Sequence, residues 1–414
     1  MAKPEIKETA SGYELLWIDN HITVSVNRLQ VHNDGRVTGE IFIKNSERAL
    51  YPPSQLNFSS TRTRKELVKH LSETYKDNDW QGIVDQLCYI IQERSRRGEP
   101  VQEAWAGDDV EPPEYILEPF LVKNYPNVIF GDPGTLKSTT ALLFSQLVML
   151  PWQDNPLNLR TPQLPQNVLY LDWETDLATI KWQLTLIQRG IEDKPALMVK
   201  YRRCAMPLAQ DIEEIKKSIL SENARIIIVD SLGLAAGGEL KEAQPALTFF
   251  SALRQLEVTS LILAHSPKDN ENVKNKSIYG SMFFQALSRN IWEIRKQQDT
   301  GDTVAHMALF HKKSAPFQAP RQPIGFKFVF DNGATSIEPE DPKTVGEFLE
   351  KMKIKDQLIQ ILKSGPKETA EIIAEIKGSD EKTVRSSLSQ YVRNNLLVKV
   401  GNGYGLQAQR DINA

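Results

Sequence analysis

The sequence is poor in cysteine and has no excess of charge of one sign. Its 414 residues contain two cysteines, Cys88 and Cys204, and 50 basic against 53 acidic residues, a net charge of −3. Two distant cysteines outside any paired spacing argue against a disulfide framework or a cysteine–histidine zinc site, and they are typical of a reducing cytoplasm. Because the whole chain has no basic excess, any binding of nucleic acid must depend on local positive charge.

Long apolar runs are also missing. The opening residues, MAKPEIKETASGYELLW, lack the apolar core of a secretory signal. The longest apolar stretch, at 141–150, is broken by Ser145 and Gln146 and is too short to cross a bilayer. The composition, 40% hydrophobic and 25% charged residues, is that of a soluble globular protein. We therefore expect a cytoplasmic protein with no membrane partner.

Three blocks differ in their residue patterns, which suits a chain long enough for two or three domains. Residues 1–110 combine strand-like alternation with helical spacing and predict a small α+β domain. Residues 115–340 alternate apolar runs with helical patterns, which predicts an α/β domain with a mostly parallel sheet. Residues 350–414 contain three short amphipathic helices and two strands around Gly401-Asn402-Gly403, an order that suggests a winged helix.

The apolar runs of the middle block are the expected strands. Ligands of such sheets bind beyond the carboxyl ends of the strands, and we expect every motif described below to lie at one of those ends. The runs are 128–130, 168–172, 226–230, 261–264 and 308–310.

A glycine turn between the first of these strands and a helical run predicts a site for ATP. Backbone N–H groups at the start of a helix surround one concave spot and attract phosphate. Lys137 would reach the β- and γ-phosphates, and the Ser138 hydroxyl would ligate Mg²⁺. Leu136 stands where this motif expects glycine, so its side chain must point away from the phosphates; a coincidental glycine turn is the alternative. The predicted nucleotide-binding residues are Gly131, Asp132, Pro133, Gly134, Thr135, Leu136, Lys137, Ser138 and Thr139.

Two further strands end in carboxylates. Asp230 follows Ile226–Val229 and could hold Mg²⁺ opposite Ser138, although a turn residue is the simpler alternative. Glu174 comes just after the strand that contains Asp172, and it is the better candidate for the base that orients the attacking water. Its alternative role is to cap the helix that begins near Leu177.

With these residues in view, the block resembles the RecA-like hexameric ATPases, a family that includes plasmid replicative helicases and ATPases of phages and mobile elements. Residues 50–71, LYPPSQLNFSSTRTRKELVKHL, are similar to the leader domain of some phage and archaeal members. The order of several segments carries the resemblance: GDPGTLKS, VLYLDWETD, YRRCAMPLAQDIEEI, IIIVDSLG, LILAHSPK and GSMFFQALSRNIWEI.

The resemblance implies a RecA-like core and a role for each matching residue. Glu174 corresponds to the catalytic glutamate, and His265 to a sensor of the γ-phosphate; a hydrogen-bonded histidine at a strand end is the alternative. Lys313, with Arg289 behind it, would be a cationic finger that completes the site of a neighbouring subunit. Alternatively, Lys312 and Lys313 are a solvated hairpin end. A finger acting on a neighbour implies a ring or filament, which we expect to be a hexamer.

Two sets of basic residues are candidate DNA contacts. Lys268, Lys274 and Lys276 lie in a polar loop after His265, although Asp269 and Glu271 dilute its charge. Residues 351–414 hold 11 basic and 7 acidic residues, a local net charge of +4. In a winged helix the last helix would lie in the DNA groove, though such domains also bind proteins. The contacts predicted from this helix and from the wing are Lys382, Arg385, Arg393 and Lys399.

The leading hypothesis is therefore an ATP·Mg²⁺-dependent motor on single- or double-stranded DNA, a ring-forming helicase or translocase of a replication or mobile-element system. Its N-terminal domain would bind other proteins of that system. An ATP-dependent switch or loader with slow turnover and no unwinding is the alternative, because one fold supports both activities. A third hypothesis, a winged-helix regulator with a degenerate ATPase block, has only Leu136 in its favour.

Overall fold

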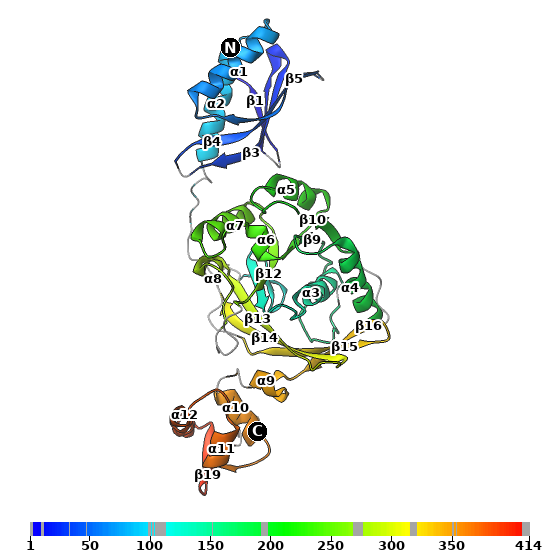
Figure 1. The fold of residues 1–414 in the computed structure, drawn as a ribbon, viewed down its shortest axis with the longest axis vertical. Helices are drawn as coiled ribbons and strands as arrows, with labels where there is room; N and C mark the ends of the chain where they lie inside the picture. The colour runs from blue at the N-terminus through cyan, green and yellow to red at the C-terminus, as the bar shows by residue number, and fades with distance from the viewer. Residues whose placement is uncertain are drawn as a thin grey trace. The chain divides into compact units, whose positions relative to one another are not determined.

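The structure, a computed structural model, is shown in Figure 1. By contacts the chain divides into two units: residues 1–112 with 206–224 and 251–256, and residues 113–205, 225–250 and 257–414. The predicted division into three domains stays a prediction. The structure describes residues 3–9, 12–32, 34–46, 48–97, 101, 103, 113–150, 152–191, 198–267, 276–314, 321–349, 352 and 354–407.

The N-terminal part is an antiparallel sheet with two helices on one of its faces (Figure 1). Apolar residues alternate along the strands, and the inward-facing set, with Trp17 and Val24 among it, packs with Trp80 and Leu87 of the second helix. Each helix begins with a side-chain cap, from Ser60 in one and Asp79 in the other. The elements are β1 (Glu5–Thr9), β2 (Gly12–Trp17), β3 (Ile22–Val31), β4 (Val37–Asn45), β5 (Arg48–Asn57), α1 (Thr61–Thr74) and α2 (Trp80–Arg96).

The central part is built on one nine-stranded sheet, with strands in the order β10-β9-β11-β12-β8-β13-β14-β15-β16. The first six of these strands are parallel to one another, which confirms the predicted α/β fold. The parallel strands are β8 (Pro126–Gly131), β9 (Val168–Asp172), β10 (Lys200–Arg203), β11 (Ile226–Asp230), β12 (Thr259–His265) and β13 (Asn290–Gln297).

Every residue of β9 and β11 is buried, so both faces of the sheet are covered. On one face, α3 and α4 join the main hydrophobic core, which contains Leu143 of α3 and Ile180 of α4 (Figure 1). The helices that connect the parallel strands are α3 (Lys137–Met149), α4 (Leu177–Gly190), α5 (Ile212–Ser221), α6 (Leu232–Ala236), α7 (Ala243–Gln255) and α8 (Met282–Leu287); β6 (Tyr115–Leu117) and β7 (Leu121–Val122) form a small separate sheet.

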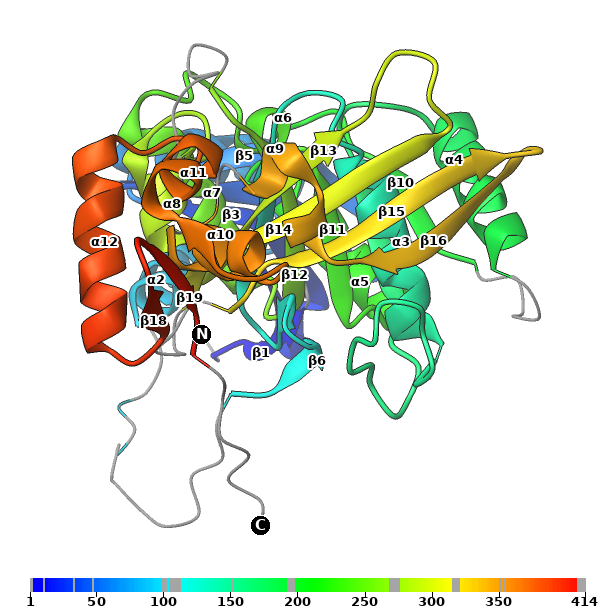
Figure 2. The same ribbon diagram turned by 90° about the horizontal axis from the view of Figure 1, so that it is seen from below.

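Three long antiparallel strands extend the sheet beyond β13, and they lie side by side in Figure 2. They are β14 (Val304–Ser314), β15 (Ile324–Asp331) and β16 (Ala334–Glu340). The predicted strand at 308–310 is therefore part of β14, but it runs opposite to the parallel strands. The end of β14, which contains Lys313, therefore lies beside the start of β13. For Lys313, the expectation that every motif lies at the carboxyl ends of the strands is wrong.

The C-terminal part has its own small core. Val384 and Leu388 of its last helix are buried, and Tyr391 and Val392 pack against this core. The strand at 367–368 was not predicted; it pairs with β19 to make a three-stranded sheet. The elements are α9 (Gly346–Leu349), α10 (Ile354–Leu362), β17 (Lys367–Glu368), α11 (Thr369–Glu375), α12 (Glu381–Arg393), β18 (Leu397–Val400) and β19 (Gly403–Leu406).

Within the described ranges, no helix is both long enough and apolar enough to cross a bilayer.

Candidate functional site

The phosphate loop joins β8 to α3 and lies at the carboxyl end of the parallel strands. Gly131 ends β8 with a neighbouring backbone so close that a Cβ there would lie 2.4 Å from the carbonyl oxygen of Ile294. Gly134 has φ +77°, a left-handed conformation that suits glycine. The two glycines therefore meet separate demands of the loop, close packing against β13 and a tight turn before α3.

Leu136 occupies the position where glycine was expected. Its backbone is left-handed, with φ 54° and ψ 33°, so the residue adopts the conformation that glycine would take more easily. Its half-buried side chain packs against the main hydrophobic core. The side chain therefore points away from the loop's concave face, as the sequence argument required.

The ammonium group of Lys137 lies within the loop itself. Its Nζ donates hydrogen bonds to the carbonyl oxygens of Asp132 at 2.8 Å and Gly131 at 3.2 Å. The residue is only 7% exposed, and this burial lowers the pKa of the Lys137 ammonium. A phosphate bound at the loop would place negative charge beside this buried ammonium and stabilise its charged form.

Asp230 ends β11 and faces the first turn of α3. Its Oδ2 accepts hydrogen bonds from the Ser138 hydroxyl at 2.6 Å and from the Tyr170 hydroxyl at 2.5 Å. Burial raises the pKa of the Asp230 carboxyl, and the two hydroxyl donors partly offset this rise. The predicted pairing of Ser138 with Asp230 is present, whereas Tyr170 was not predicted.

Asp172 and Glu174 have separate tasks in the turn after β9. The buried Asp172 carboxylate accepts hydrogen bonds from the amides of Glu174 at 2.8 Å and Thr175 at 2.9 Å, and from the Tyr201 hydroxyl at 2.9 Å. Asp172 therefore shapes the turn. The cap of α4 is Asp176, which accepts from the Thr179 amide, so the alternative in which Glu174 caps this helix is wrong.

The carboxylate of Glu174 points instead toward the end of β12. Its Oε1 lies 3.4 Å from Nε2 of His265, and this contact is the main cause that lowers the pKa of Glu174. His265 is the register partner of Gly131 in the neighbouring strand β8. Its Nδ1 is buried and has no hydrogen-bond partner within the part of the chain that the structure describes. Glu174, His265 and the phosphate loop are thus adjacent.

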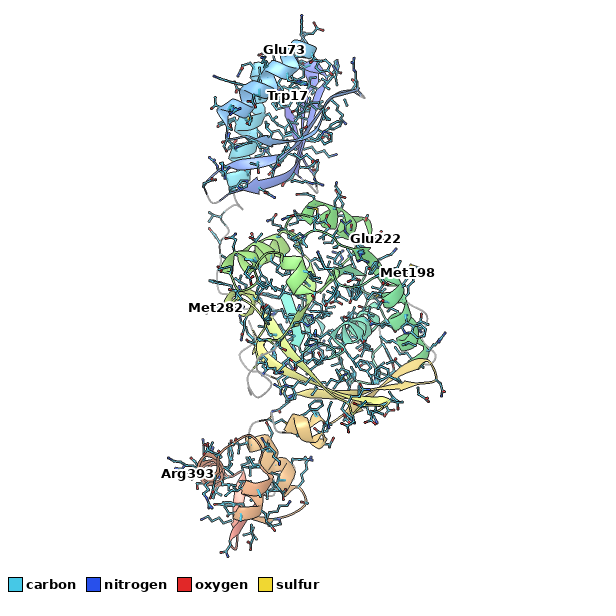
Figure 3. All side chains as sticks on the ribbon, in the orientation of Figure 1. Trp17, Glu73, Met198, Glu222, Met282 and Arg393 are labelled. Carbon is cyan, nitrogen blue, oxygen red and sulfur yellow. The ribbon has the colours of Figure 1, made fainter. Side chains whose placement is uncertain are left out.

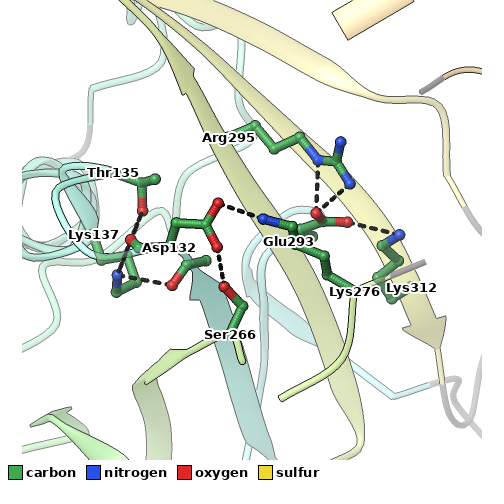
Figure 4. A network of polar contacts seen from close by, with 9 residues as sticks. Asp132, Thr135, Lys137, Ser266, Lys276, Glu293, Arg295 and Lys312 are labelled. Carbon is green, nitrogen blue, oxygen red and sulfur yellow. Dashed lines mark hydrogen bonds and ion pairs between the residues drawn. The ribbon is translucent and has the colours of Figure 1, made fainter. Parts of the chain in front are cut away.

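Figure 4 shows a second group of charges beside the loop. The carboxylate of Asp132 accepts hydrogen bonds from Ser266 and Lys276. Lys276, predicted to contact DNA, is therefore bound to the phosphate loop in this structure. Its predicted companions, Lys268 and Lys274, lie outside the described residues.

The same view contains a buried carboxylate that sequence reasoning missed. Glu293 is 1% exposed, and its two oxygens meet Arg295 (Nε at 2.6 Å) and Lys312 (Nζ at 2.7 Å). The Arg295 guanidinium also lies 5.4 Å from the centre of the Phe310 ring. Arg295 lies two residues further along the same strand, on the same face as Glu293, and the pairing of β13 with β14 brings Lys312 to it.

The predicted finger residues lie far along the sheet from the phosphate loop. Lys313 is paired with Ile291, which in turn pairs with Val128 near the start of β8, and its Nζ donates to the carbonyls of Gln285 and Ala286 in α8. The backbone amide of Arg289 donates to Pro126 at the start of β8. Lys313 lies toward the amino ends of the parallel strands because β14 runs antiparallel to β13, and Arg289 lies there because it directly precedes β13. Both residues are therefore directed away from this chain's own loop.

The predicted DNA contacts of the C-terminal part are exposed. They are Lys382, Arg385 and Arg393 on α12, and Lys399 on β18. Arg393 is labelled in Figure 3. Arg385 forms an ion pair with Glu381 one turn earlier, at 2.8 Å. All four side chains are exposed to solvent, and Arg385 is the one whose charge is already paired, with Glu381.

The residues at the loop fit a nucleotide with Mg²⁺. The Ser138 hydroxyl and the Asp230 carboxylate provide the oxygen ligands that Mg²⁺ prefers, 2.6 Å apart. Over the described residues there is no group of three or more His, Cys, Asp or Glu side chains that could hold a metal alone. Magnesium in nucleotide sites is usually coordinated by phosphate oxygens and water together with one or two protein ligands.

Comparison with known proteins agrees with this description. Residues 91–271 match a family model described as an AAA domain, and no curated protein matches the sequence. Among 339 matching solved chains is a KaiC-like protein from the hyperthermophilic archaeon Pyrococcus horikoshii OT3, 13% identical, with a TM-score of 0.36 over 54% of this chain and 94% of that chain. The family match, the order of the parallel strands and the phosphate loop together indicate a nucleotide-binding α/β domain.

Proposed function

We propose that the central sheet and its loops form a RecA-like P-loop ATPase domain and that the chain hydrolyses ATP to drive a DNA-directed motor. The motor would be a ring-forming helicase or translocase, with a hexamer as the expected assembly. The replication or mobile-element setting, and protein partners of the N-terminal part, belong to the same proposal.

One observation carries the ATPase chemistry: five side chains of suitable kinds meet at one edge of the sheet. Lys137 would neutralise the β- and γ-phosphates. Ser138 and Asp230, which are hydrogen-bonded to each other, would hold Mg²⁺, and the metal would supply positive charge to offset that of the phosphates. Glu174 orients the attacking water, and a lowered pKa keeps its carboxyl ionised for this task. His265, beside Glu174, connects hydrolysis with the segment that follows β12.

The need for a second copy of the chain comes from the finger residues. Lys313 and Arg289 lie toward the opposite edge of the sheet from Gly131. A cation stabilises the charge that develops on the transferred phosphoryl group only when it lies next to it. In our proposal these residues serve the nucleotide of a neighbouring subunit, in a head-to-tail interface that closes into a ring.

The C-terminal part is proposed to be a winged helix that binds DNA. In its favour are the three helices, the hairpin around Gly401 and the exposed Lys382, Arg385 and Arg393 on the last helix. Such cations would neutralise backbone phosphates, so binding should weaken as salt is raised.

Steady-state ATP hydrolysis, measured with and without single-stranded DNA, tests the proposal. We expect DNA to stimulate turnover in the wild type. Glu174→Gln should lower turnover by about 10²-fold or more while ATP still binds, because only the water-orienting base is lost. Lys137→Ala should lose both binding and turnover, and Lys181→Ala, at an exposed lysine on α4 of the same part of the chain, is the matched control. Assembly size is recorded in parallel, and a strand-displacement assay then separates helicase from translocase.

A switch or loader with slow turnover is the second candidate. Two contacts favour it: the Glu174 carboxylate is held by His265, and the Lys313 ammonium is held by carbonyls of α8. In this candidate both groups stay with these partners, and turnover is slow because each has to change partner before it acts on a nucleotide. ATP binding without turnover, unchanged by DNA, would refute the motor and support the switch.

A further inference from the structure

The stretch that follows β12 is attached to the phosphate loop at both of its ends. At the first end, the Ser266 amide donates to the carbonyl of Gly131 at 3.1 Å, and its hydroxyl donates to the Asp132 carboxylate. At the second end, Nζ of Lys276 lies 2.5 Å from the other oxygen of the same carboxylate. Ser266 and Lys276 therefore both donate to the carboxylate of Asp132 (Figure 4).

The Lys276 contact is a charge-assisted hydrogen bond in a sheltered place. The Lys276 side chain is 11% exposed, while that of Asp132 is 47% exposed. Although partial burial raises it, the pKa of Asp132 is lowered overall by the hydrogen bonds from Lys276 and Ser266. Ionised pairs of this kind are about twice as strong as neutral hydrogen bonds.

The neighbouring backbone provides a reporter of this attachment. Three residues after Lys276, the amide of Tyr279 donates to the carbonyl of His265 at 2.8 Å. Two residues further on, the amide of Ser281 donates to Leu240 at 2.7 Å. If Lys276 holds this part of the chain in place, both amides are protected from exchange with solvent only while the lysine stays bound.

We propose that Asp132 is a positioning residue: it binds Ser266 and Lys276 to the phosphate loop, and nucleotide at the loop adds to the attraction that holds Lys276 there. The proposal rests on the proposed function, because it assumes that phosphates occupy this loop. It replaces the predicted DNA contact of Lys276 with a role inside the ATPase site.

Electrostatics gives the direction of the nucleotide effect. The loop's amides and Lys137 would hold the phosphates next to Asp132. A triphosphate adds several negative charges there, and in a partly buried site such charges act on a nearby cation more strongly than in water. Lys276 should therefore be held more tightly when the loop is filled. Residues 276–281 would then respond to the nucleotide through Lys276, in addition to any response through His265, the proposed sensor of the γ-phosphate.

Hydrogen–deuterium exchange over residues 276–281 of the full-length protein is the test. Without nucleotide, Lys276→Met and Asp132→Ala should raise the exchange rate about tenfold, the effect of losing a hydrogen bond to a charged group. Lys276→Arg should keep the protection because it keeps the charge, and Lys181→Met, at an exposed lysine on α4, is the matched control. With the non-hydrolysable analogue AMP-PNP and Mg²⁺, exchange should slow at least about threefold in the wild type and stay unchanged in Lys276→Met.

Equal exchange in the wild type, Lys276→Met and Asp132→Ala would overturn the proposal. Thermal melting and exchange over β8 identify a variant that has lost its fold. Lys276→Met and Asp132→Ala change residues in different segments, so if one of them fails to fold, the other still tests the proposal. Failure of the proposed function is a separate result. If the wild type neither binds nor hydrolyses ATP, the comparison without nucleotide still decides whether Asp132 fastens this stretch.

Discussion

Replacing Leu136 by alanine and by glycine separates the two ways in which this residue affects the phosphate loop. The backbone at Leu136 is left-handed, with φ 54° and ψ 33°, while its half-buried side chain packs on the core. Alanine removes the packing and keeps the strain that a Cβ causes in this conformation. Glycine removes both.

The expected magnitudes follow from these two contributions. Full burial of a leucine side chain is worth about 1.5–3 kcal/mol, so a half-buried one contributes about 1 kcal/mol. The left-handed conformation costs a residue with a Cβ about 1 kcal/mol. Leu136→Ala should thus lower the free energy of unfolding by about 1 kcal/mol, whereas Leu136→Gly should come within about 0.5 kcal/mol of the wild type. Glycine is expected to be the more stable of the two, the reverse of their order inside a helix.

Urea unfolding measures the stabilities, and titration with a fluorescent ATP analogue measures binding. Because the side chain points away from the concave face, neither variant should change the affinity for ATP by more than about threefold, or about 0.7 kcal/mol. The reasoning is refuted if alanine proves as stable as glycine. It is refuted equally if glycine raises the affinity tenfold, since Leu136 would then obstruct the phosphates.

Two further predictions concern buried polar side chains. Tyr170→Phe removes the hydroxyl that donates to Asp230 at 2.5 Å, so we expect turnover to fall about three- to tenfold while the affinity for ATP is unchanged. Initial rates at several Mg²⁺ concentrations measure this effect, and an unaltered rate would contradict a positioning role for Tyr170. His311 stacks on Trp292 with ring centroids 4.3 Å apart, and burial lowers its pKa to about 4 from 6.5. Since the unfolded chain binds the extra proton between those values, stability should rise with pH from about 4 to 6.5, by up to about 3 kcal/mol. His311→Phe keeps a stacked ring and should flatten the melting temperature over that range; equal pH slopes for the two proteins would rule out the assignment.

The parts of the site that could be predicted are those in which residues adjacent in sequence do the chemistry together. A glycine turn between a strand and a helix specifies its own geometry, which is why Gly131, Lys137 and Ser138 lie where they were expected. Asp230 could be placed opposite Ser138, although 92 residues separate them, because the carboxyl ends of parallel strands share one edge of a sheet.

Other parts of the site could not be predicted because they depend on which strand lies beside which. Tyr170 is one of several apolar-looking residues in its run, and only the neighbouring strand β11 gives its hydroxyl a partner. The direction of β14 is not encoded in its own apolar pattern, so Lys313 was assigned to the wrong end of the sheet. Lys276 was assigned to DNA from the charge of its loop, whereas the return of the chain brings it to Asp132.

By itself the sequence determined the chemistry of the loop, the α/β class and the presence of a small C-terminal helical unit, since these follow from local spacing and from the burial that apolar patterns demand. The tertiary structure alone decided the antiparallel extension of the sheet, the burial of Glu293 between two cations and the meeting of Ser266 and Lys276 on Asp132. The physical reason is that electrostatic and hydrogen-bond partners are chosen by distance in space, and the chain packs these partners together only after its strands have found their neighbours.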